Sequence, residues 1–192
     1  MVRRWSGTIV AMVADGPTVL ATTMGFHRGG RTWSPGPVFT LAFELASAAA
    51  SPRLCFIATA GGDRASSIAG CYAAFAGSQV RVSHLALFDM PNVADVRAHL
   101  LAQDVIWVDR GSLVNLVALW RAHRVDAVLR ECWRAGVVLA GESAGSLCWH
   151  ASGTTDSFGP TVTGAPGLGL LPYANAVHYH QRRTALHGLM AD

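Results

Sequence analysis

Short apolar runs alternate with longer helix-like segments along this chain, and that alternation constrains the fold more than any other feature. Val, Ile and Leu dominate the runs that we expect to be strands, at 18–21, 53–58, 81–87, 105–108 and 136–140. The segments between them are each long enough for a crossover helix: 38–50, 65–76, 93–102 and 113–132, the last divided near 123–125. The sequence therefore predicts an α/β fold, with helices on both faces of a mostly parallel sheet.

Length and composition exclude several classes of protein. With 192 residues, the chain has the size of one domain, so 1–192 is treated as a single unit. No stretch reaches the roughly 18 to 20 apolar residues that a membrane-spanning helix needs. The net charge is only +3 and the arginines are scattered, which does not suggest a nucleic-acid interface. A signal peptide is not predicted, because Asp15, Gly16 and Pro17 follow the short apolar start where a cleavage site would be expected. These features favour a cytoplasmic protein that binds neither nucleic acid nor a membrane.

The four cysteines do not form a recognisable metal or redox pattern. Cys55, Cys71, Cys132 and Cys148 match neither a CxxC pair nor a zinc-ligand spacing. We therefore expect buried free thiols, and we predict no metal and no cofactor.

A candidate nucleophile lies directly after the last apolar run. Residues 141–145 read Gly-Glu-Ser-Ala-Gly and precede a helix-compatible stretch over 146–150. This is the expected context of a nucleophile elbow, a sharp strand-to-helix turn that lifts a serine hydroxyl above the sheet. The glycines leave room around the backbone of that turn. We therefore interpret Ser143 as a nucleophile, although an ordinary serine in a βα turn would give the same pattern.

A serine needs a base to accept its proton, and two histidines are better placed than the other six. His178 and His180 follow a Gly/Pro-rich segment, where a strand end could bring them beside the elbow. Alternation in an extended segment favours His178, because Val177 and Tyr179 would face the other side. His180 shares the face of His178 and stays open on this argument. His150 follows Ser143 by about two helical turns and is expected to point away from it.

The residue that would orient the base is expected in the segment 152–172. This segment is rich in Gly, Thr, Ser and Pro, which indicates a functional loop or hairpin at the edge of the domain. Asp156 is the only acid between Ser143 and Asp192, so it is the natural candidate. An Asx-turn or a cap is the competing interpretation.

These motifs resemble those of peptidase E, a family of serine peptidases on a class I glutamine-amidotransferase-like fold. The Gly-Glu-Ser-Ala-Gly segment resembles the family's G-x-S-A-G, 154–156 resembles its T-x-D, and 177–179 resembles the segment that ends in its catalytic histidine. The resemblance implies a three-layer sandwich with Ser143 as nucleophile, His178 as general base and Asp156 as orienting acid. It also favours His178 over His180, and it implies a short peptide as substrate, with an N-terminal Asp in the known cases.

Two departures from the family pattern affect what the chain is expected to do. Residues 108–112 read Val-Asp-Arg-Gly-Ser where the family typically has a run of three glycines. The resemblance assigns the oxyanion-hole N–H groups to Gly111 and Ala144, but Arg110 could crowd the site or prevent a glycine-only conformation. The chain also stops soon after His178, where relatives continue into further strands. We therefore expect either an incomplete sheet edge or one completed by a partner chain, as in a homodimer.

Two alternatives to an active peptidase follow from the same residues. A binding or regulatory member of the fold would result if Asp109 and Arg110 close the site. An α/β-hydrolase esterase shares the elbow, but His178 follows Ser143 too closely to leave room for that fold's later strands. If the chain is a peptidase, Arg110, Arg182 and Arg183 are candidate partners for a substrate carboxylate.

Overall fold

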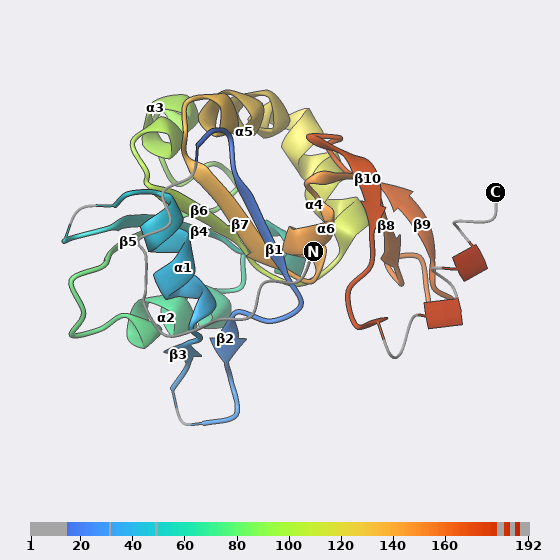
Figure 1. The fold of residues 1–192 in the computed structure, drawn as a ribbon, viewed down its shortest axis with the longest axis horizontal. Helices are drawn as coiled ribbons and strands as arrows, with labels where there is room; N and C mark the ends of the chain where they lie inside the picture. Colours follow the sequence, from blue (N-terminus) through green and yellow to red (C-terminus); the bar gives the residue numbers. More distant parts are fainter. Residues whose placement is uncertain (1–14, 31, 49, 180–182, 185–186, 189–192) are drawn as a thin grey trace.

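The computed structural model describes residues 15–30, 32–48, 50–179, 183–184 and 187–188. Its central sheet has five strands in the order β1-β7-β6-β4-β5 (Figure 1). They are β1 Val19–Thr22, β4 Arg53–Ile57, β5 Arg81–Leu85, β6 Val105–Val108 and β7 Val138–Glu142. Every neighbouring pair is parallel, so the carboxyl ends of all five strands lie at one edge of the sheet. The predicted α/β class is confirmed.

Helices cover both faces of this sheet. One face carries α1 Val38–Leu45 and α2 Ala65–Ala74, and the other carries α3 Val96–Leu101, α4 Leu113–Ala122 and α5 Val125–Arg134. Strand β6 shows why both faces can be covered, because it is buried along its whole length. Its Ile106 and Val108 join the core under α3, α4 and α5, whereas Val105 and Trp107 join the core under α1 and α2. The two-residue period of a strand thus builds two separate apolar cores.

The segment predicted as a loop or hairpin forms most of a second, smaller sheet. This sheet has the order β10-β8-β9, with β8 His150–Thr155, β9 Thr163–Pro166 and β10 Leu171–Asn175. Strands β8 and β9 pair antiparallel as a hairpin, and β10 pairs parallel with β8. It lies beside α4 and the short helix α6 Ala144–Leu147 (Figure 1). The hairpin is confirmed, but the sequence did not predict a separate sheet.

A second hairpin was not predicted at all. Strands β2 Phe26–His27 and β3 Ser34–Pro35 pair antiparallel between β1 and α1. They project from the sheet edge at which the central strands end (Figure 1). This hairpin brings residues to the active-site region that no motif had marked.

Several predicted boundaries were wrong. The helix expected over 38–50 ends at Leu45, and Ser47 follows with a φ of 47°. The helix expected from 93 begins only at Val96, where the Asp95 carboxylate caps it by accepting the Ala98 N–H. The helix expected over 146–150 stops at Leu147, and His150 instead begins β8.

The last central strand also runs further than expected. Strand β7 was predicted to end at 140 but extends to Glu142, because Glu142 still pairs with Thr22 of β1. None of the helices within the described residues is both long and apolar enough to cross a membrane.

Candidate active site

Ser143 stands at the turn between β7 and α6, at the carboxyl edge of the central sheet. Its backbone has φ 54° and ψ −116°, a conformation that costs energy for a residue with a side chain. Close packing holds the turn in place. A Cβ added to Gly145 would lie 2.1 Å from the carbonyl oxygen of Val108, so only glycine allows α6 to approach β6 this closely. The predicted nucleophile elbow is therefore present in its geometry.

His178 lies beside this serine. Its Nε2 is 3.3 Å from the Ser143 Oγ, within the range expected of a nucleophile and its base. The predicted approach of these two side chains is confirmed, but the reasoning from alternation was wrong. The segment after β10 bends instead of remaining extended, and His178 has a φ of 55°. Val177 is buried while Tyr179 is 46% exposed, so the two do not share a face. His180 lies outside the described residues.

A polar contact joins the segment before His178 to the helix after Ser143. The Asn175 side-chain amide, at the end of β10, donates to the Ser146 Oγ at 3.1 Å. The same amide lies 3.4 Å from Nδ1 of His150, which is itself 3.1 Å from the Ser146 carbonyl oxygen. Burial lowers the pKa of His150 and favours its neutral form. His150 thus supports the back of the elbow, and the expectation that it points away from the hydroxyl agrees with these contacts.

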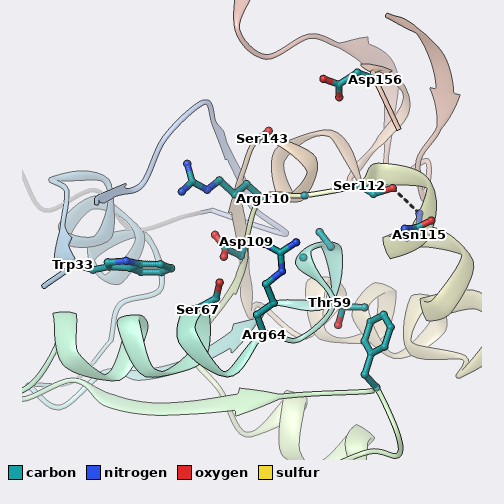
Figure 2. Close-up of a pocket in the computed structure, with 15 residues that line it drawn as sticks. Trp33, Thr59, Arg64, Ser67, Asp109, Arg110, Ser112, Asn115, Ser143 and Asp156 are labelled. Carbon is teal, nitrogen blue, oxygen red and sulfur yellow. Dashed lines mark hydrogen bonds between the residues drawn. The ribbon is translucent and has the colours of Figure 1, made fainter. Parts of the chain in front are cut away.

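Asp156 follows β8 and reaches the same pocket as Ser143. It lies in the turn of the β8–β9 hairpin and lines the pocket together with the serine (Figure 2). Its side chain is exposed. The structure thus brings Asp156 to the site, and its role as the orienting acid stays a prediction.

The loop after β6 carries the predicted oxyanion donor Gly111. Within the loop 109–112, only Gly111 has a positive φ, at 149°, so Asp109 and Arg110 occupy positions that do not require glycine. A Cβ on Gly111 would lie 2.1 Å from the carbonyl oxygen of Ala60, which leaves glycine as the residue that fits. Among the described residues, the N–H groups of Gly111 and Ala144 donate to no partner. Gly111 lines the same pocket as Ser143, and Ala144 directly follows that serine, so their role as oxyanion donors stays a prediction.

A pocket of about 640 Å³ opens in front of Ser143. Two exposed arginines reach into it, Arg110 from the loop after β6 and Arg64 from the start of α2 (Figure 2). Trp33 of the β2–β3 hairpin and Phe88 give it apolar walls. Arg64 was missed in the sequence, although the glycine pair at 61–62, a few residues after a buried strand, is a signal that could have found it. Trp33 had no such signal. Arg183 is exposed, and Arg182 lies outside the described residues.

Comparisons with known proteins identify the family of this chain. The model of peptidase family S51 matches residues 38–191. The chain belongs to peptidase family S51. It is 42% identical to the uncharacterized peptidase YgaJ of Bacillus subtilis over 144 residues, which are 73% of this chain and 62% of the relative. The chain therefore spans somewhat less than two thirds of that relative's length.

A solved structure shows the same fold. A protein from Listeria monocytogenes EGD-e, named as a candidate peptidase E, matches with a TM-score of 0.56 and 19% identity. The match covers 78% of this chain and 80% of that one. The resemblance to peptidase E that the motifs indicated is confirmed at the level of family and fold.

This S51 member carries a buried acidic residue where the family's glycine run was expected. Asp109 is 4% exposed, and its Oδ1 lies 2.5 Å from the Arg28 guanidinium. The same guanidinium forms an ion pair with Glu142, which is 1% exposed. Burial raises the pKa of Asp109 to about 7, and the nearby Glu142 carboxylate adds to this while Arg28 opposes it. Arg28 is a further residue of the site that the sequence did not indicate.

All four cysteines are free and buried, as expected, and burial raises the thiol pKa of each. No group of metal-ligating side chains is found among the described residues.

Proposed function

We propose that this protein is a serine peptidase that hydrolyses short peptides, with Ser143 as nucleophile and His178 as general base. The observation that carries the proposal is the 3.3 Å approach of the Ser143 Oγ to the His178 Nε2 at a strained nucleophile elbow. Membership of family S51 supports the same reaction class.

The reaction would proceed through an acyl-enzyme. The Ser143 Oγ attacks the scissile carbonyl carbon while its proton passes to the His178 Nε2. The N–H groups of Ala144 and Gly111 donate to the oxyanion of the tetrahedral intermediate. His178 then gives its proton to the leaving amine as the C–N bond breaks, and it later activates the water that releases the acyl group. We assign Asp156 to the orientation of His178, because it lines the same pocket.

The pocket supports a small, carboxylate-bearing substrate. Its volume of about 640 Å³ suits a dipeptide, and two exposed arginines line it. A guanidinium binds a carboxylate through two parallel hydrogen bonds, so we assign Arg110, with Arg64, to the acidic group of an Asp-containing dipeptide. The buried free thiols suit a reducing compartment, and we extend the proposal to a cytoplasmic location.

The test combines covalent labelling with turnover. Wild-type protein should react with a fluorophosphonate at one serine and should hydrolyse dipeptides with an N-terminal Asp. Ser143→Ala should abolish both, with a loss of up to about 10⁶ in kcat and an unchanged fold. Ser67→Ala is the matched control, because Ser67 lines the same pocket from α2. Labelling that persists in Ser143→Ala would exclude Ser143 as the nucleophile.

A non-catalytic binding member of the fold is the second candidate. The observation in its favour is that the Arg110 side chain extends across the pocket below Ser143, at a position where a glycine was expected (Figure 2). Binding of acidic dipeptides without labelling or turnover would support this function. A gain of about 10² or more in Asp109→Gly/Arg110→Gly would instead indicate an enzyme impaired at its oxyanion hole.

A further inference from the structure

Two acidic residues stand side by side beneath the active site. Strands β6 and β7 are parallel neighbours in which Val108 pairs with Gly141. The next residues along the two strands are Asp109 and Glu142, and both are buried. Asp109 lies two residues before Gly111, and Glu142 directly precedes Ser143. Like charges at neighbouring buried positions repel, so both carboxylates can stay ionised together only with a cation between them.

Arg28 of the β2–β3 hairpin supplies that cation. One terminal nitrogen of its guanidinium pairs with Asp109 at 2.5 Å, and the other pairs with Glu142. The second Glu142 oxygen accepts the backbone N–H groups of Gly25 and Phe26, which begin the same hairpin. A single planar group thus joins the strand ends that carry the oxyanion loop and the nucleophile.

Aromatic rings fix the orientation of the guanidinium. Its central carbon lies 4.2 Å from the centre of the Trp33 ring and 5.3 Å from that of Phe26. Trp33 also lines the substrate pocket. The Arg28 side chain is only 11% exposed, so solvent screens its ion pairs weakly. The hairpin, the oxyanion loop and the elbow therefore meet at one buried group.

We propose that Arg28 is a positioning residue of the active site: by bridging the carboxylates of Asp109 and Glu142, it holds the Gly111 loop at a fixed distance from the Ser143 elbow. This inference rests on the proposed function, in which Gly111 and Ser143 act on one substrate carbonyl. An error of about 1 Å in such a distance can cost about 10² in rate. Lysine carries the same charge at a single point, so it cannot bridge both carboxylates in the geometry of a guanidinium.

The experiment compares Arg28→Lys with Arg97→Lys. Arg97 pairs with Glu131 on the surface between α3 and α5, where its side chain is 61% exposed, so it is a matched control for an arginine-to-lysine change. We expect Arg28→Lys to slow fluorophosphonate labelling by about 10² and to lower kcat far more than it raises KM. Hydrogen exchange of the folded protein should rise in the segments 109–112 and 142–145. Arg97→Lys should change none of these quantities.

Arg28→Lys protein that labels within about twofold of the wild-type rate would overturn the proposal, as would a rise in exchange spread evenly over the chain. If wild-type protein fails to label, the proposed function is lost, and the exchange pattern alone decides the role of Arg28. If Arg28→Lys does not fold, Arg28→Met/Asp109→Asn replaces it, because this variant removes one buried charge of each sign. Labelling of that folded variant at the wild-type rate would overturn the proposal too.

Discussion

The two sides of the active site are built in different ways. Ser143 directly follows a buried central strand, and backbone atoms of β6 contact the turn so closely that Gly145 has no room for a Cβ. His178 lies in a bend beyond β10, a strand of the smaller sheet whose middle residues are exposed. On that side, a side-chain hydrogen bond from Asn175 to the Ser146 Oγ makes the link to the helix after the elbow.

Because of this difference, the position of the Ser143 elbow is fixed by the packed core, whereas the position of the His178 segment can shift. A steric constraint made by backbone atoms has no alternative arrangement, because the packed interior cannot give way at that point. A link made by one amide is worth about 1 kcal/mol and can be lost without unfolding. We therefore expect changes on the serine side to act on the fold and on activity together. Changes on the histidine side should act mainly on activity.

The largest effect is expected from Gly145→Ala. The new Cβ would lie 2.1 Å from the Val108 carbonyl oxygen, so β6 and α6 would have to separate. We expect a loss of about 3 kcal/mol or more in the free energy of unfolding, measured by urea titration, together with complete loss of fluorophosphonate labelling.

The matched control is Gly16→Ala. No atom lies within 4 Å of a Cβ added to Gly16, and its φ is outside the left-handed range. This variant should keep wild-type labelling and should change the free energy of unfolding by less than about 1 kcal/mol. Wild-type labelling in Gly145→Ala would show that the serine side is no more constrained than the histidine side.

A smaller effect, on activity more than on stability, is expected from Asn175→Ala. It removes the hydrogen bond to Ser146 that links the His178 segment to α6. We expect labelling to slow by about tenfold, because the base is no longer held beside the serine. The free energy of unfolding should fall by only about 1 kcal/mol.

Gln103→Ala tests whether that loss of rate is specific. The Gln103 amide donates to the His99 carbonyl oxygen at 2.8 Å and accepts from the Ser83 Oγ at 3.3 Å, at the opposite end of the sheet. Gln103→Ala should lose at least as much stability as Asn175→Ala and keep the wild-type labelling rate. Equal labelling rates in the two variants would show that Asn175 does not hold His178 beside Ser143.

The same difference explains what the sequence could predict. The Ser143 elbow is contiguous in sequence, because strand, glycine, serine and helix follow one another, and pattern alone located it. The His178 Nε2 does lie 3.3 Å from the Ser143 Oγ, but the sequence argument for it used an alternation that the bend does not follow. The strand boundaries of the central sheet were close for a related reason, since buried parallel strands are continuous apolar runs.

Long-range contacts are where the sequence was uninformative. Arg28 lies 81 residues from Asp109, and Phe26 lies 116 residues from Glu142. The hairpin that carries Arg28 and Trp33 has strands of only two residues, too short to show a period. Only the folded chain brings these side chains together, so neither the buried charges nor the apolar pocket wall could be predicted.

The smallest effect on activity is expected from Asp109→Asn, and it should depend on pH. The pKa of Asp109 rises from 3.8 to about 7 in the folded protein, chiefly through burial. Between these values the folded state binds a proton that the unfolded state has released. Protonation of Asp109 therefore stabilises the folded state fully below about pH 4, and this stabilisation is lost as the pH rises through about 7. The amide oxygen of asparagine can still accept a hydrogen bond from the Arg28 guanidinium, so the bridge keeps its shape and labelling at about pH 6 should slow by less than about threefold. Unfolding by urea at a series of pH values should show wild-type stability falling between about pH 4 and pH 7, and this fall should be smaller in Asp109→Asn. Parallel stability curves for the two proteins would mean that Asp109 keeps an ordinary pKa and that the guanidinium of Arg28 outweighs its burial on the serine side of the site.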